Sequence, residues 1–307
     1  MRRAALALTV LCAASARAGD NDLQLWRLGH PDNVFVCTVC DGSDRTLETG
    51  DPAAQLRFAR LTASLALAFA PPFEDQAQTT GQAGFELGFS AQVAYPTLAP
   101  DEWPSAGTQG TGVAPRALFL PTVTLRKGLG GSFELGAAVS LLAGSQMLGL
   151  SGQVRWAPLE GLYSAPDLAL RAWATRVVGA QDLDLAFGGA DLLISKSFGL
   201  AGTLRLQPYA QYGVVLVNAT SAIVDFRPGS ENPRDPTADD GSFRSVAFWQ
   251  NLYHRAAIGA RLVSGALVLG LEGGLAMGRN GVQRDAPSGA DQFTRMWTSS
   301  ARLGVAF

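Results

Sequence analysis

The sequence predicts an all-β protein, a transmembrane, antiparallel, up-and-down β-barrel of about ten strands with a short N-terminal extension. Three observations support this fold class. Apolar and polar residues alternate over most of residues 83–307, the connections between these segments are short and long in turn, and a basic, then apolar, leader opens the chain. We therefore divide the chain into a signal peptide (1–18), an extension (19–82) and a barrel (83–307).

The leader has the three parts of a secretory signal peptide. Arg2 and Arg3 form a basic start, residues 4–15 are apolar, and Ala16-Arg17-Ala18 is a small-x-small cleavage site. The leader holds three of the 24 Lys and Arg residues and none of the 26 Asp and Glu residues, so the mature chain has a formal charge of −5. Its basic residues are scattered singly, which argues against nucleic-acid binding.

The three cysteines point to no cofactor. Cys12 lies in the leader, where Val10 and Leu11 do not fit the small residues that precede a lipoprotein acylation site. Cys37 and Cys40 are candidates for a short disulfide in an oxidising, exported compartment. No thioredoxin-like pattern surrounds them, and the residue after Cys40 is not the His of a haem-attachment motif.

Residues 55–70 fit two interpretations. Leu61, Leu65 and their neighbours alternate as in a strand, but the same segment also carries a helical apolar stripe. Single-chain bacterial barrels have an even number of strands, so an eleventh strand here would require a twelfth. Only residues 34–39 are available to form it. We expect a periplasmic helix or plug-like extension, with a twelve-stranded barrel as the alternative.

The alternation is clearest in residues 85–95. One face carries Phe85, Leu87, Phe89, Ala91, Val93 and Tyr95, and the other carries Glu86, Gly88, Ser90, Gln92 and Ala94. In a membrane barrel the first face meets lipid and the second lines the lumen. The pattern returns near 114–127, 131–143, 146–157, 167–178, 182–197, 202–224, 243–263, 266–278 and 294–307.

One segment breaks the pattern. Within residues 182–197, the apolar residues Leu183, Leu185 and Phe187 have one parity, and Leu192 and Ile194 have the other. If all five face lipid, an extra residue must absorb the slip. We expect a β-bulge at Gly188-Gly189.

The connections alternate in length. Tight turns near 128–130, 199–201 and 264–265 are expected on the periplasmic side, and the long polar connections near 97–113, 225–242 and 279–293 on the extracellular side. The residues Trp103, Trp156, Trp249, Trp297 and Tyr95 are candidates for aromatic girdles at the membrane interfaces.

The end of the chain carries the most specific signal. Trp297, Ser299, Ala301, Leu303, Val305 and Phe307 alternate with smaller or polar residues. This segment resembles the terminal strand of bacterial outer-membrane β-barrel proteins. The resemblance implies that Phe307 is an assembly signal. It also implies outer-membrane location after signal-dependent export, and contact with membrane lipid, periplasmic chaperones and the barrel-assembly machinery. We expect a monomer.

The predicted lumen face carries charged residues, namely Glu86, Arg126, Glu134, Arg155, Arg171, Arg205, Arg261, Glu272 and Arg302. One interpretation is a charged constriction that selects solutes. The other is a filled polar interior in which these groups pair with each other, with Arg126 near Glu134.

Catalytic and metal sites are not expected. His254 lies on the lipid-facing parity without a nucleophile beside it, so a hydrolase is a third hypothesis only. The acidic loop residues Glu231, Asp235, Asp239 and Asp240 have the ligand type of a hard-cation site but lack EF-hand spacing, and a solvated loop is the simpler interpretation.

The sequence therefore leaves two main functions open. The first is a small channel or uptake protein for small solutes, and the second is a non-conducting barrel with a structural, adhesive or surface-recognition role.

Overall fold

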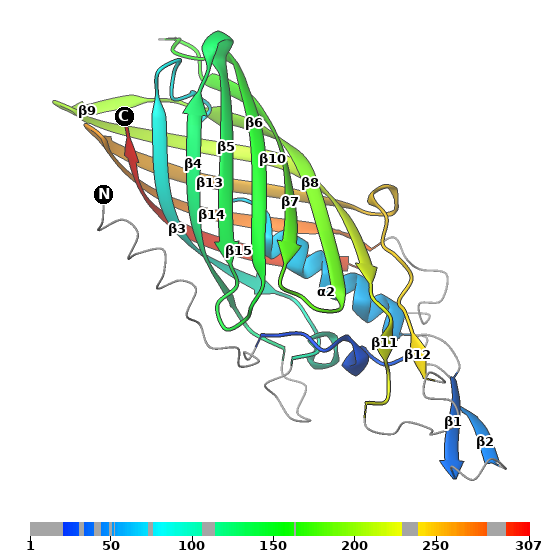
Figure 1. Cartoon of the computed structure of the whole chain (residues 1–307). Helices are drawn as coiled ribbons and strands as arrows, with labels where there is room; N and C mark the ends of the chain where they lie inside the picture. The colour runs from blue at the N-terminus through cyan, green and yellow to red at the C-terminus, as the bar shows by residue number, and fades with distance from the viewer. Residues whose placement is uncertain are drawn as a thin grey trace.

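A computed structural model describes residues 21–30, 34–39, 44–48, 51, 53–72, 76–105, 114–162, 164–228, 239–280 and 293–307. In these ranges, ten long antiparallel strands form a closed wall (Figure 1). They are β3 (Phe85–Pro96), β4 (Leu118–Gly128), β5 (Phe133–Leu141), β6 (Leu148–Leu159), β7 (Asp167–Val178), β8 (Leu183–Ser195), β10 (Leu204–Ser221), β13 (Leu252–Ser264), β14 (Leu267–Arg279) and β15 (Phe293–Ala306). Each pairs with the next along the chain, and β15 pairs with β3. The predicted ten-stranded barrel is confirmed.

The two ends of the barrel sequence meet at the seam. Phe85 N donates to the carbonyl oxygen of Phe307 at 3.0 Å, and Phe307 N donates to that of Phe85 at 2.8 Å. The short strand β9 (Phe198–Ala201) pairs with the start of β10, which also pairs with β8 farther along. Closure of the wall leaves no long unpaired edge among the described strands.

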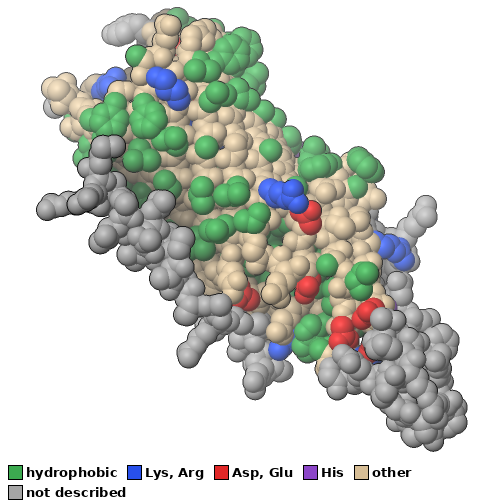
Figure 2. All heavy atoms as spheres, viewed as in Figure 1, with side chains coloured by type: hydrophobic (Ala, Val, Ile, Leu, Met, Phe, Trp, Pro, Cys, Tyr) green, Lys and Arg blue, Asp and Glu red, His purple; other side chains and the backbone are tan. Residues whose placement is uncertain are grey.

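The outer surface of the wall is apolar and the inner surface is polar. Leu87, Phe89 and Leu303 are about half exposed, whereas Glu86 and Arg302 are buried. Figure 2 shows hydrophobic side chains spread along the wall. An apolar surface this large is unfavourable in water and is the surface that a barrel presents to lipid. The fold is that of an outer-membrane β-barrel.

The two ends of the barrel differ. Short turns connect β4 to β5, through the 3-10 turn η3 (Gly130–Ser132), and β13 to β14; the C-terminus lies at this end, which we call the tight-turn end. The opposite end, which we call the loop end, carries the long connections. These include η2 (Pro100–Glu102), β11 (Val224–Asp225), β12 (Asp240–Gly241) and η4 (Phe248–Gln250).

The N-terminal segment contains η1 (Leu25–Leu28), a hairpin of β1 (Val34–Val39) and β2 (Asp44–Glu48), and the helix α2 (Ala54–Phe69). The helix predicted for residues 55–70 is confirmed, and α2 lies inside the barrel (Figure 1). Fourteen of its residues are buried. A helix that is apolar on nearly all sides needs cover on all sides, and the lumen provides it. No described helix has the length and hydropathy to cross a membrane.

The segment enters the barrel from the loop end. Asn21 N donates to the carbonyl oxygen of Gly144, and Gln24 N donates to that of Pro104, each at 2.8 Å. Residues 21–24 therefore contact two connections at the loop end, one between β3 and β4 and one between β5 and β6. Pro71, Pro72 and Gln76 contact arginines of the inner wall, and β3 starts at the tight-turn end.

The predicted β-bulge at Gly188-Gly189 is wrong. The register of β8 with both β7 and β10 is continuous through these residues. Leu183, Leu185 and Phe187 are buried, whereas Leu192 and Ile194 are exposed. The first three residues face inward and belong to the same apolar cluster as α2. The lumen is therefore apolar near the loop end, where the helix occupies it.

Candidate functional site

The candidate site is the occupied lumen. We call α2 together with residues 70–84 the plug, and its extended part, described at residues 71–72 and 76–80, the strap.

The loop-end part of α2 is anchored by charges. Arg57 Nε lies 2.7 Å from Asp101 Oδ2, and Arg57 Nη1 lies 2.6 Å from Asp51 Oδ2. Arg60 Nη1 lies 3.0 Å from Glu102 Oε1. These ion pairs bind α2 to η2 and to Asp51, which precedes α2 in the chain.

Two further contacts hold the same part of the helix. The ring of Phe58 stacks on Phe243 at 4.7 Å between centroids. Gln55 exchanges two hydrogen bonds with the backbone of Arg244, at 2.8 and 3.0 Å. The helix is therefore bound on one side by η2 and on another by the connection between β12 and β13.

Two carboxyl groups of this charged anchor have shifted pKa values. Burial alone would raise the pKa of Asp51, but hydrogen bonds from Arg57 and the Ala53 N–H, with the charge of Arg57, hold it below its ordinary value. Burial raises the pKa of Glu102 even though the Ala99 N–H and Arg60 oppose the shift. The contacts of Asp51 with Arg57 and the Ala53 N–H therefore stabilise its ionised form.

Wall arginines bind carbonyl oxygens of the strap. Arg255 Nη1 donates to Pro71 O at 3.0 Å, Arg171 Nη1 to Pro72 O at 3.4 Å, and Arg155 Nη1 to Gln76 O at 3.3 Å. At the end of α2, Gln92 Nε2 donates to Ala68 O at 2.8 Å. The lumen wall therefore supplies donors to the backbone of the plug.

Nearer the tight-turn end, the wall supplies acceptors. The carboxylates of Glu134 and Glu160 accept from the N–H groups of Thr80 and Thr79 at 2.9 and 2.8 Å. Ser195 Oγ accepts from Ala77 N at 2.9 Å. These contacts are with the strap's backbone, and the side chains of Gln78 and Thr79 add hydrogen bonds to Asp167 and Glu160 at 2.9 and 3.0 Å.

The wall's charges also pair with each other. Glu86 forms ion pairs with Arg126, with Arg261 at 3.0 Å and with Arg302 at 2.8 Å. Glu134 lies 3.7 Å from Arg126 and 3.2 Å from Arg155. These groups form one buried network, as the filled-interior interpretation of the sequence expects.

A third buried carboxylate, Asp191, pairs with two further arginines. Asp191 Oδ2 lies 2.8 Å from Arg171 Nη2 and 2.9 Å from Arg255 Nη2. The guanidinium of Arg255 also lies over the ring of Trp173 at 4.6 Å. Asp191 therefore neutralises two arginines that both bind the strap.

The structure places most of the predicted lumen residues together. Seven are buried in the networks above, namely Glu86, Arg126, Glu134, Arg155, Arg171, Arg261 and Arg302. Glu272 is half-buried and accepts a hydrogen bond from Tyr209 Oη at 3.0 Å. Arg205 is exposed, because it lies at the tight-turn end of β10 beside β9.

Sequence reasoning missed Asp191 and Arg255. The assumed bulge obscured the parity of Asp191. The alternation could have identified Arg255. His254 was placed on the lipid face, and the next residue of a strand points to the opposite face, which here is the lumen. His254 is exposed as predicted, and its Nδ1 lies 2.6 Å from Tyr212 Oη.

Little space is left around the strap. One interior cavity of about 20 Å³ is lined by Pro71, Pro72 and Arg302, among others, and a second of about 20 Å³ by Leu67, Arg255 and others. A cavity of this size holds about one water molecule. In the described part of the barrel, these cavities provide no continuous path for a solute.

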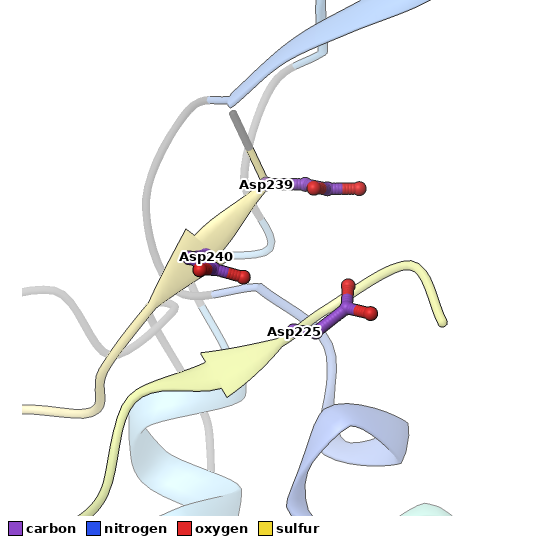
Figure 3. A group of neighbouring side chains, drawn as sticks. All are labelled: Asp225, Asp239 and Asp240. Carbon is purple, nitrogen blue, oxygen red and sulfur yellow. The ribbon is translucent and has the colours of Figure 1, made fainter. Parts of the chain in front are cut away.

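An acidic group lies at the loop end. The carboxylates of Asp225, Asp239 and Asp240 come within 4.8 Å of one another across the β11–β12 pair (Figure 3). Their oxygens are of the type that binds Ca²⁺, but such groups also stand alone in water. The candidates Glu231, Asp235 and Cys40, and the side chain of Cys37, lie outside what the structure describes.

Comparison with known proteins finds similarity only in architecture. No family model and no curated protein matches the chain. Among solved structures, LpxR from Salmonella typhimurium is 8% identical over 72% of this chain and 99% of its own, with a TM-score of 0.34. The outer-membrane protein OprG from Pseudomonas aeruginosa is 11% identical over 76% and 99%, with a TM-score of 0.30. Neisserial surface protein A is 12% identical over 74% and 100%, with a TM-score of 0.29.

Proposed function

We propose that this protein is a plugged outer-membrane barrel that presents its N-terminal segment and long loops at the cell surface, and that it does not conduct solutes while the plug is in place. The observation that carries the proposal is the course of the N-terminal segment. Residues 21–24 contact two connections at the loop end, whereas β3 starts at the opposite end. The plug joins these two ends through the lumen.

The orientation follows from the general build of such barrels. Bacterial outer-membrane barrels have short turns on the periplasmic side and long loops outside. If this chain follows that rule, η1, which contacts β11, and the β1–β2 hairpin lie outside the cell (Figure 1). A surface-recognition or adhesive role then fits better than transport.

The filled lumen also disfavours the solute channel. Five of the six arginines expected to line an open path instead bind buried carboxylates or strap carbonyl oxygens, and the sixth, Arg205, is exposed at the tight-turn end. Breaking such buried pairs costs several kcal/mol, so a spontaneous opening is rare.

The first test locates the N-terminal segment on intact cells. A short epitope is inserted between β1 and β2, and in a matched control the same epitope is inserted after Gly265 in the tight turn between β13 and β14. We expect antibody to label the first variant on intact cells and the second only after the outer membrane is permeabilised. The reverse pattern would refute surface display.

The second test measures conduction. The purified, folded wild-type protein should give no discrete current steps in planar bilayers. Regular openings at low voltage would contradict the non-conducting state and restore the channel hypothesis.

A further inference from the structure

The outer surface of β13, β14, β15 and β3 combines exposed arginines with hollows in the wall. We infer that this surface binds an anionic, phosphate-bearing lipid from the leaflet at the loop end, with the arginines holding its phosphate and a hollow holding one of its acyl chains. The inference goes beyond surface display and does not depend on which side of the membrane the loop end faces.

The arginines lie near the loop end of this surface. Arg279 at the end of β14 and Arg295 near the start of β15 are both exposed and have the parity of the lipid-facing residues. Arg279 pairs with Phe293, so Arg295 is its diagonal neighbour at roughly 7 to 8 Å. No ion pair between described residues involves Arg295. A guanidinium at this level attracts anionic lipid and can hold a phosphate with two parallel hydrogen bonds.

A hollow of about 620 Å³ adjoins Arg279 on the outside of the barrel. Its lining also includes Phe248, Leu252 and Trp249, which is 85% exposed. Tryptophan is enriched where lipid headgroups meet the hydrocarbon, because its ring is amphipathic. This hollow therefore offers a cation and apolar rings at the level of a headgroup.

A second hollow, of about 740 Å³, lies nearer the middle of the same strands. Small residues of β3, β14 and β15 line it, namely Ala91, Gly273, Ser299 and Ala301. The larger side chains of Ile258 and Leu271 stand beside them and are 71% and 68% exposed. Small residues next to protruding ones leave an apolar recess, which the chain of a bound lipid can fill.

The spacing of these features fits one lipid. Arg295 and Ala301 are separated by six positions on β15, or about 20 Å along the strand. Strands of such barrels tilt by about 40°, so the difference in depth is about 15 Å, half the thickness of the hydrocarbon core. The arginines therefore lie at the headgroup level when the second hollow lies near the bilayer centre.

A lipid fits this surface better than a second copy of the chain does. Two copies in one membrane have the same orientation, so a symmetric contact through β14 and β15 would bring Arg295 of each copy to the same level. Like charges repel there, whereas a phosphate supplies the opposite charge.

The test follows the fluorescence of Trp297, which is 61% exposed and lies between Arg295 and Ser299 on β15. The full-length protein is folded into phosphatidylcholine vesicles, and brominated phosphatidylglycerol or brominated phosphatidylcholine is added in increasing mole fractions, since bromine on the acyl chains quenches nearby tryptophan. A Trp297→Phe version of each variant gives the share of the other tryptophans. We expect half-quenching of Trp297 at a lower mole fraction of phosphatidylglycerol, and we call the ratio of the two mole fractions the preference.

The first matched pair of variants tests the charge. Arg295→Gln should lower the preference about fivefold, the contribution of one arginine near a membrane surface. Arg295→Lys should keep most of it. Arg176→Gln should leave it unchanged, because Arg176 is exposed on the lipid-facing side of β7 and pairs with Asp184 at 2.9 Å.

The second matched pair tests the hollow. Gly273→Leu adds a side chain where no atom lies within 4 Å of a Cβ, so it fills the recess without a clash and should lower the preference. Gly152→Leu on β6 is the control, because Gly152 is also exposed, also has no atom within 4 Å of its Cβ and does not line the hollow. Heat-modifiable migration checks that each variant is folded.

Equal half-quenching by the two lipids in the wild type would overturn the inference. So would a preference that Arg295→Gln leaves unchanged, or one that Arg176→Gln and Gly152→Leu lower as much as their partners do. Disulfide cross-linking of Ser299→Cys between copies in the vesicles would assign the surface to a second copy instead.

Discussion

Asp191 and Asp184 provide a matched pair for testing whether the lumen network stabilises the barrel. Both lie on β8 and both pair with an arginine of β7. Asp191 is buried and receives hydrogen bonds from Arg171 Nε at 2.9 Å and from Arg255 Nε and Nη2 at 3.1 and 2.9 Å. Asp184 contacts Arg176 at 2.9 Å with both side chains more than half exposed.

The expected magnitudes differ because only one pair is shielded from water. Asp191→Asn keeps the shape but removes the negative charge that faces two buried guanidinium groups, which should cost about 3 to 5 kcal/mol. Asp184→Asn removes an exposed pair and should cost about 1 kcal/mol or less.

The assay is urea-induced unfolding in lipid vesicles, followed by tryptophan fluorescence. Trp173 is a suitable reporter because it lies against Arg255. The double substitution Asp191→Asn with Arg255→Gln should recover part of the loss, since it also removes one of the two positive charges that Asp191 balances. Equal losses for the two single variants would refute the idea that buried charge pairing holds the lumen together.

Three further predictions concern the plug and the seam. Phe58→Ala should weaken docking of α2 by about 3 to 5 kcal/mol, because it empties the space beside Phe243, and limited proteolysis of the folded protein should then cleave near the helix. The lowered pKa of Asp51 means that its contact with Arg57 stabilises the docked segment above the ordinary aspartate pKa and is lost as the pH falls below about 4. Proteolysis by an acid-active protease should therefore speed up at low pH in the wild type and depend less on pH in Asp51→Asn. Deletion of Phe307 removes both seam hydrogen bonds with Phe85, so cells should accumulate less of the heat-modifiable, outer-membrane form; unchanged amounts would contradict the assembly role.

The sequence alone was sufficient for the wall. The alternation in residues such as Leu87 and Glu86 follows from the backbone of an extended strand, where successive side chains point to opposite faces. Because this period is local, it predicted the strand number, the lipid face and most of the buried charges without any knowledge of distant contacts. The same reasoning failed in β8, where an apolar residue was assumed to face lipid although the lumen near α2 is also apolar.

Only the tertiary structure decided what fills the barrel. The pairing of carboxylates with arginines, such as that of Glu86 with Arg261, depends on closure of the wall and on strand register. Both bring together residues that are far apart in the chain. The direction in which the plug enters depends likewise on contacts such as that between Asn21 and Gly144, which no local pattern encodes. Burial of an apolar helix of this length is strongly favourable, but its sequence does not determine where it is buried. In this structure the interior of the closed wall surrounds it.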